Sequence, residues 1–163
     1  RRMGGKGKLL VLEGMPGQQT ADDRLKGVKE VLAKNPGIAV ISQTGKWTLD
    51  EGRNVTENTL QRWPDLNSIL CIGGEMALGA VEAVKAADKE GKITISSMDV
   101  YPAQVAAVKA GKVHYTISQA PQDQAYWSVV AAIRALNGEK VPQEIRTPVV
   151  VVTKENVDKY AEQ

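Results

Sequence analysis

The chain has 163 residues and a formal net charge of +2, and 42% of its residues are hydrophobic and 25% charged, as in an ordinary globular domain. Its basic residues are scattered among acidic ones, which argues against a nucleic-acid-binding surface, and no apolar run reaches the roughly 20 residues of a membrane helix. The single cysteine, Cys71, excludes an internal disulfide and a multi-cysteine metal site.

Short apolar runs alternate with helix-like periodicity along the whole chain. The predicted strands cover about residues 8–13, 38–43, 68–72, 92–97, 113–118 and 148–153. The predicted helices cover about residues 20–35, 49–62, 75–90, 102–110 and 122–137, with a last short helix at the end. This alternation predicts an α/β protein with a doubly wound, mostly parallel sheet between two helical layers.

Local signals mark the helix boundaries. Thr20 with Asp23, and Thr48 with Glu51, resemble capping boxes that open two helices. The other boundary residues are two prolines at helix starts and three glycines just past helix ends: Pro102, Pro121, Gly91, Gly111 and Gly138.

Five predicted strands stop at a short polar cluster that a helix pattern follows. The clusters are Gly14-Met15-Pro16-Gly17, Gln43-Thr44-Gly45-Lys46-Trp47, Gly73-Gly74-Glu75, Met98-Asp99 and Gln119. In an open parallel sheet all these segments fall at the carboxyl ends of the strands, where a ligand crevice forms. The repetition predicts a small-molecule site at this edge.

Two side chains near this edge suit a flat, polar ligand. Trp47 offers an apolar ring face, although it would also serve to cover the end of the sheet. Arg24, on the first turn of a predicted helix, can reach the same crevice with its planar fork of donors, or pair with the neighbouring Asp22 or Asp23.

Two further polar side chains follow the fourth and fifth strands. Asp99 can accept two hydroxyl hydrogen bonds, or cap the helix predicted over 102–110. The amide of Gln119 can both donate and accept.

The sequence contains no candidate set of catalytic residues and no candidate set of metal ligands. His114 is the only histidine and is expected at the opposite end of the sheet, and the glycine clusters match no phosphate-binding loop. No serine lies in a nucleophile elbow. We therefore expect neither an enzyme nor a metal or cofactor site.

Two junctions break the regular alternation. One is Ala120-Pro121-Gln122-Asp123, and the other is the long polar stretch from Asn137 to Pro148. Both fit plain surface loops, and both also fit crossings between two lobes. Tyr126 and Trp127, on the helix between them, are expected to serve a core or an interface.

A set of short strings resembles the periplasmic sugar-binding proteins of the ribose-binding type. The strings are Gly14-Met15-Pro16-Gly17 with Asp23-Arg24-Leu25-Lys26-Gly27, Glu75-Met76-Ala77-Leu78-Gly79-Ala80, Met98-Asp99, Ala110-Gly111-Lys112, Gly138-Glu139-Lys140-Val141-Pro142 and Thr153-Lys154-Glu155-Asn156-Val157. The resemblance covers nearly the whole chain and corresponds to the carboxyl-terminal portion of such proteins. Their two α/β lobes are joined by three crossings, and the ligand is trapped between the lobes.

The resemblance implies a domain organisation. Residues 1–119 would form the carboxyl-terminal ligand-binding lobe without its first helix, and residues 120–147 would carry a helix that crosses to the missing amino-terminal lobe. Residues 148–163 would supply the returning strand and the terminal helix.

The resemblance also implies a set of ligand contacts. Arg24, Trp47, Asp99 and Gln119 stand where the family has an arginine, an aromatic residue, an aspartate and a hinge glutamine. Gly73 stands where an asparagine is usual, and Trp47 replaces the more usual phenylalanine. These two changes would enlarge or reshape the pocket, so the expected ligand is a sugar bulkier than a pentose, a polyol or another polar molecule.

The implied function is solute binding for an ABC-type sugar importer by hinge closure, with an inner-membrane permease as partner and no direct membrane insertion. The implied location is the periplasm, or a lipid anchor outside a single-membrane bacterium. The first alternative is the effector-binding domain of a lactose-repressor-type regulator. A flavodoxin-like enzyme and a self-associating assembly module, with an apolar patch around Tyr126, Trp127 and Val130, are further alternatives.

Overall fold

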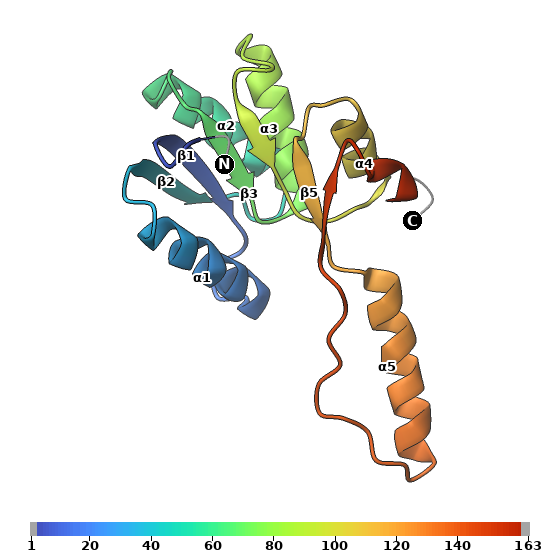
Figure 1. Ribbon diagram of the computed structural model, residues 1–163. Helices are drawn as coiled ribbons and strands as arrows, with labels where there is room; N and C mark the ends of the chain where they lie inside the picture. Colours follow the sequence, from blue (N-terminus) through green and yellow to red (C-terminus); the bar gives the residue numbers. More distant parts are fainter. Residues whose placement is uncertain (1–2, 161–163) are drawn as a thin grey trace.

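The computed structural model describes residues 3–160, which form one sheet, the helices around it and a projecting arm (Figure 1). The strands are β1 (Gly7–Glu13), β2 (Ile38–Thr44), β3 (Ser68–Cys71), β4 (Thr94–Ser96), β5 (Tyr115–Ser118) and β6 (Val150–Thr153). The helices are α1 (Gln19–Ala33), α2 (Leu49–Arg62), α3 (Gly74–Ala86), α4 (Pro102–Lys109), α5 (Pro121–Leu136) and the 3₁₀ helix η1 (Val157–Tyr160). Positions 1–2 and 161–163, included in the predicted first and last segments, lie outside the described residues.

The sheet has the strand order β2-β1-β3-β4-β5-β6. Strands β1 to β5 are parallel, with Leu10 opposite Ile41 and Ile69, and β6 is antiparallel to β5. The α/β prediction with a mostly parallel sheet is confirmed. Because each helical crossover returns the chain to the same end of the sheet, the carboxyl ends of β1 to β5 share one edge.

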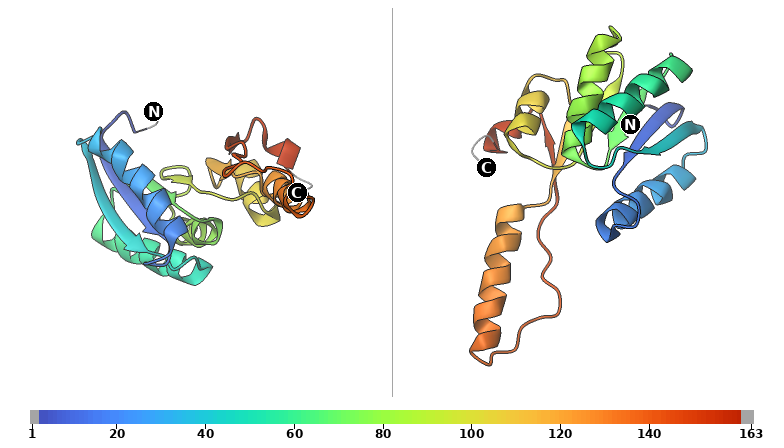
Figure 2. Two further views of the ribbon diagram at one scale, coloured as in Figure 1. Left: turned by 90° about the horizontal axis from the view of Figure 1, so that it is seen from below. Right: turned by 180° about the vertical axis from the view of Figure 1, so that it is seen from behind.

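Helices cover the two faces of the sheet unequally. α2 and α3 lie against one face, and α1 lies on the other (Figures 1 and 2). α2 and α3 pack backbone to backbone, since a Cβ atom on Gly79 would lie 2.0 Å from the carbonyl oxygen of Leu49. The buried core under these helices includes Leu10, Leu12, Ile69, Met76 and Ile95.

On the α1 side, part of the sheet is left uncovered. A cavity of about 660 Å³ lies there, and the residues around it include Val28, Leu70, Ser96, Tyr115 and Ile117. This side of the sheet is therefore open among the residues that the structure describes.

Most of the predicted helix boundaries agree with the structure. The Oγ1 atom of Thr48 accepts the backbone N–H of Glu51 at 3.2 Å, so the cap predicted for α2 is confirmed. The cap predicted at Thr20 is wrong, because α1 begins after Gln18 and Thr20 lies within its first turn. Pro102 and Pro121 open α4 and α5, and the three predicted boundary glycines have left-handed φ angles of 73°, 72° and 76°.

Residues 120–149 form an arm that leaves the sheet after β5 and returns as β6 (Figures 1 and 2). None of the residues of α5 is buried, and the side chains of Tyr126 and Trp127 are 63% and 41% exposed. The arm therefore contributes no core to the described part of the chain.

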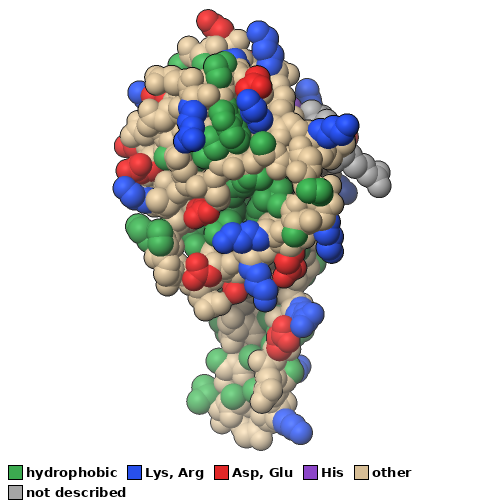
Figure 3. Space-filling model, turned by 90° about the vertical axis from the view of Figure 1, so that its left-hand side faces the viewer, with side chains coloured by type: hydrophobic (Ala, Val, Ile, Leu, Met, Phe, Trp, Pro, Cys, Tyr) green, Lys and Arg blue, Asp and Glu red, His purple; other side chains and the backbone are tan. Residues whose placement is uncertain are grey.

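The surface carries charges of both signs. Figure 3 views the molecule from the side where β2 forms the edge of the sheet, and Lys, Arg, Asp and Glu side chains alternate there with hydrophobic ones. A mixed face of this kind does not present the continuous basic stripe that nucleic-acid binding uses.

Candidate ligand-binding site

The five predicted site residues lie along the carboxyl edge of the sheet. Arg24 comes from α1, and the other four follow strands β2, β3, β4 and β5 in turn: Trp47, Gly73, Asp99 and Gln119. Asp99 lies in the loop after β4, which stops at Ser96.

A strained turn positions Trp47. Lys46 and Trp47 both have left-handed backbone conformations, with φ angles of 49° and 63°, a conformation that costs an ordinary residue about 1–2 kcal/mol. Hydrogen bonds tie the turn to the end of β1: the N–H of Gly45 donates to the Glu13 carbonyl at 2.8 Å, and the Thr44 hydroxyl donates to the Gly14 carbonyl at 2.7 Å. These bonds hold the strained backbone in place.

The indole of Trp47 lies across the ends of β1 and β3. A Cβ atom added to Gly14 would lie 1.9 Å from Cζ2 of the ring, and one added to Gly73 would lie 2.7 Å from Cε3. The indole Nε1–H donates to Oε1 of Gln18 at 2.5 Å. The space beside Gly73 is therefore filled by the ring, which fits the reshaped pocket among the two alternatives that the sequence left open.

The guanidinium of Arg24 lies close to this ring. Its Cζ atom is 5.7 Å from the centroid of the Trp47 ring, and its NH1 atom donates to the carbonyl oxygen of Ile72 at 2.6 Å. Arg24 lies beyond the first turn of α1, since the helix starts at Gln19. Its partners are thus the ring and the end of β3, and not the neighbouring Asp22 or Asp23.

The carboxylate of Asp99 joins two elements. One oxygen accepts the backbone N–H of Gly74 at 3.1 Å, and the other accepts the side-chain amide of Gln119 at 3.1 Å. Asp99 therefore caps α3, whereas the sequence suggested a cap for α4. Its φ angle of 79° is one that Asp and Asn tolerate better than most residues.

Gln119 connects this edge with the arm. Its carbonyl oxygen accepts the side-chain amide of Gln124 at 2.6 Å and the hydroxyl of Thr147 at 3.4 Å. The next residue, Ala120, has a left-handed φ angle of 50°. Both chain segments that cross into the arm are thus anchored where the fifth site residue stands.

The five residues form one continuous row. Contacts run from Gln119 to Asp99, through the Gly74 N–H to Gly73, and on to Trp47 and Arg24. The row offers a carboxylate, a carboxamide, a guanidinium and an aromatic ring. Such groups bind a hydroxyl-rich ligand with an apolar face.

Two titratable side chains near the row, Tyr101 and Cys71, are affected by burial. Burial raises the pKa of Tyr101, whose ring packs against Gly74, well above the usual range for tyrosine. Burial likewise raises the pKa of Cys71, which keeps this thiol protonated and unreactive at neutral pH. Arg24 and Asp99 are the two charged members of the row of five residues.

Sequence reasoning missed two contributors to the site. Gly14 was recognised only as part of a strand-end cluster, although it makes room for the indole, and Gln18, which holds the indole N–H, was not singled out. The sequence does contain one indication: a glycine, Gly14, follows the first strand, and a tryptophan, Trp47, follows the next strand along the chain.

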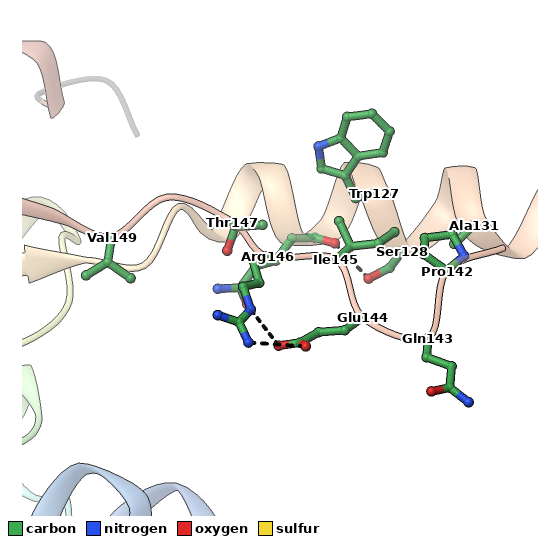
Figure 4. A pocket seen from close by; sticks show the side chains of 11 residues that line it. Trp127, Ser128, Ala131, Pro142, Gln143, Glu144, Ile145, Arg146, Thr147 and Val149 are labelled. Atoms are coloured by element: carbon green, nitrogen blue, oxygen red, sulfur yellow. Dashed lines mark hydrogen bonds and ion pairs between the residues drawn. The ribbon is translucent and has the colours of Figure 1, made fainter. Parts of the chain in front are cut away.

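A second hollow lies in the arm, between α5 and the returning segment. Its volume is about 720 Å³, and Trp127, Pro142 and Ile145 are among the residues around it (Figure 4). Arg146 forms an ion pair with Glu144 at 2.9 Å beside it. Gln124 and Thr147, which also line this hollow, bond to the carbonyl oxygen of Gln119, so the hollow begins next to the last residue of the row.

Residues 3–160 contain neither a cluster of metal ligands nor a membrane-spanning helix. No three His, Cys, Asp or Glu side chains in this range come together as metal ligands. Nor does any helix there combine the length and apolar character needed to span a bilayer.

A mostly parallel sheet with a row of polar and aromatic groups at its carboxyl edge defines an α/β ligand-binding lobe. Residues 1–140 match the periplasmic binding protein domain. The chain is 37% identical over 153 residues to the ribose import binding protein of Haemophilus influenzae, covering 94% of this chain and 52% of that protein. The chain belongs to the periplasmic binding protein domain family.

Solved structures agree with this assignment. A solute-binding protein of an ABC transporter from Actinobacillus succinogenes with bound D-allose superposes with a TM-score of 0.92 at 34% identity, over 98% of this chain and 56% of that one. A solute-binding protein from Bacillus halodurans with bound myo-inositol gives 0.89 at 31% identity, over 97% and 55%. The chain spans about half the length of these relatives.

Proposed function

We propose that the chain is the carboxyl-terminal, ligand-binding half of a solute-binding protein that serves an ABC-type importer. Its ligand would be a sugar or a polyol, held by Arg24, Trp47, Gly73, Asp99 and Gln119. The observation that carries the proposal is the continuous row that these residues form at the carboxyl edge of the sheet.

The proposed mechanism is closure of two lobes around the ligand. Asp99 and Arg24 would orient hydroxyl groups by charge-assisted hydrogen bonds, and Trp47 would contact the apolar face. A second lobe would supply the remaining contacts, and the closed state would be favoured because only there do both sets form. The row described here is one wall of such a site.

The arm supports the proposed division of the chain. Residues 1–119 would form the lobe, residues 120–147 would cross into the second lobe, and residues 148–163 would return to the first. An amphipathic helix such as α5, with no buried residue of its own, needs a partner to be stable. The apolar side chains around the hollow in the arm would pack against that second lobe.

Location and partners follow from the same proposal. The parent protein would work in the periplasm, or on a lipid anchor outside a single-membrane bacterium, and deliver its ligand to an inner-membrane permease. The regulator alternative is less well supported, because the relatives described above are named as import and solute-binding proteins.

The first test is ligand titration of the 163-residue chain with D-allose, D-ribose, myo-inositol and xylitol at millimolar concentrations. We expect at least one of them to raise the urea midpoint of unfolding. At a concentration tenfold above Kd the stabilisation would be about 1.4 kcal/mol.

Asp99→Asn is the matched variant for this titration. It keeps a side chain that tolerates the backbone conformation and can accept the Gly74 N–H, but it removes the charge. We expect the ligand-induced shift to fall sharply in this variant and to persist in Thr20→Ala. If none of the four compounds stabilises the unmodified chain, the sugar and polyol proposal fails.

A further inference from the structure

We propose that Gly14 and Gly73 together form a seat for the Trp47 indole, and that this seat makes the site select cyclic sugars and cyclitols over acyclic polyols. The seat is a structural claim about three residues. The selectivity rests on the proposed function, and it narrows the ligand to molecules with a flat face of C–H groups.

Neither glycine is required by its backbone conformation. Gly73 has φ −154° and ψ 153°, an extended conformation that any residue adopts, and Gly14 is not among the residues with positive φ. The absence of a side chain at these two positions therefore has another cause.

That cause is the indole ring. The added Cβ atoms would approach opposite ends of its six-membered ring, Cζ2 from Gly14 and Cε3 from Gly73. Since both approaches are closer than 3.0 Å, a methyl group at either glycine requires the ring to shift from its present position. Protein interiors respond to such overpacking by displacing side chains.

The turn before the ring enforces the same placement. Lys46 and Trp47 adopt left-handed conformations that tryptophan seldom adopts, and the turn is bonded to the end of β1 through Glu13 and Gly14. Strain of this kind persists where the surrounding structure fixes it, which is common at binding sites. In this protein the strained turn places the Trp47 ring against Gly14 and Gly73.

The seated ring forms an apolar wall. Its only hydrogen-bonding group is already bound to Gln18, and Gly73 adds no side chain beside it. The guanidinium of Arg24 lies 5.7 Å from the ring centroid, and the other polar groups lie farther along the row, at Asp99 and Gln119. A ligand in this site turns C–H groups toward Trp47 and hydroxyls toward Asp99. A cyclic sugar does so with little loss of conformational entropy, whereas an acyclic polyol must lose more because its chain is flexible.

A double-mutant cycle tests the seat without any ligand. Gly73→Ala should lower the urea midpoint and shift the Trp47 indole N–H resonance in a ¹H–¹⁵N spectrum, because the new methyl group displaces the ring. In a Trp47→Ala background the same substitution should leave the midpoint unchanged or raise it, since the space is then free. Gly27→Ala is the matched control, because a Cβ atom there meets nothing within 4 Å.

Two outcomes overturn the seat. One is a midpoint loss for Gly73→Ala that is equal with and without the Trp47 ring. The other is an indole resonance that does not move in either Gly73→Ala or Gly14→Ala. Both are independent of whether a sugar binds.

The selectivity is tested with D-allose and xylitol as probes, by titration of the indole resonances in the 163-residue chain. Gly73→Ala should reduce the ratio of D-allose affinity to xylitol affinity about tenfold, which corresponds to about 1.4 kcal/mol in the difference of binding free energies. Gly27→Ala should leave that ratio unchanged. An equal loss for both probes would contradict the selectivity. If neither probe binds the unmodified chain, the proposed function and the selectivity both fail. The double-mutant cycle still tests whether Gly14 and Gly73 seat the indole, because it needs no ligand.

Discussion

Asp99 combines a structural and a proposed binding role in one carboxylate. It accepts the first N–H of α3 and the amide of Gln119, and its backbone is in a left-handed conformation. The negative charge also lies at the positive end of the α3 dipole. Its replacement should therefore show which of these contributions the fold needs.

We predict that Asp99→Ala lowers the free energy of unfolding by about 2 kcal/mol, because it removes a cap and puts alanine at an unfavourable φ. Asp99→Asn should cost less than about 1 kcal/mol, since an amide oxygen still accepts the Gly74 N–H. Urea denaturation of both variants measures the difference. Equal losses would mean that the charge, and not the cap or the backbone, stabilises this loop.

Trp47 shows how a residue can be recognised from sequence while its environment is not. Its place after β2 predicted an aromatic group at the carboxyl edge, and the structure has it there. The ring fills the space beside Gly73 because two segments 26 positions apart lie so close that a Cβ atom on Gly73 would be 2.7 Å from the ring. The spacing of residues along the chain does not predict such a distance in space.

At the level of elements, local signals place most of the helix boundaries. Proline at the first helical position and glycine in a left-handed cap act through the backbone of their own neighbours, and this is why Pro102, Pro121 and Gly138 were predicted correctly. The start of α1 was misplaced because Gly17, with φ 81°, turns the chain earlier than Thr20 would.

The two threonines give a matched pair of variants. Thr48→Ala should lower the free energy of unfolding by about 1 kcal/mol, because Thr48 accepts the N–H of Glu51 at the start of α2. Thr20→Ala should change it by less than about 0.5 kcal/mol, since Thr20 is exposed within α1. Urea midpoints of the two variants measure both effects. A larger loss for Thr20→Ala would restore the cap predicted from the sequence.

The whole molecule consists of a packed lobe and an arm with no core. The sheet and the helices α1 to α4 enclose the buried residues, whereas every residue of α5 is at least partly exposed. Helices of this length are marginal in water without tertiary contacts. The arm and the lobe should therefore differ widely in local stability.

Hydrogen exchange followed by mass spectrometry measures this difference. We predict that the amides of α5 exchange with little protection in the 163-residue chain, while those of the central strand β3 exchange only through global unfolding. If α5 is protected as strongly as β3, its apolar side has found a partner in solution. A second copy of the chain would then be the first partner to test, by measuring its mass in solution.

The sequence by itself determined the order of strands and helices, the mostly parallel sheet and the edge at which polar residues gather, since periodicity and capping are local properties of the chain. Only the tertiary structure decided that Asp99 caps α3 rather than α4, that Arg24 contacts Trp47 rather than its acidic neighbours, and that the indole occupies the space beside Gly73. Those contacts join residues from different strand ends. Their distances are set by how the sheet and helices pack, which no local pattern contains.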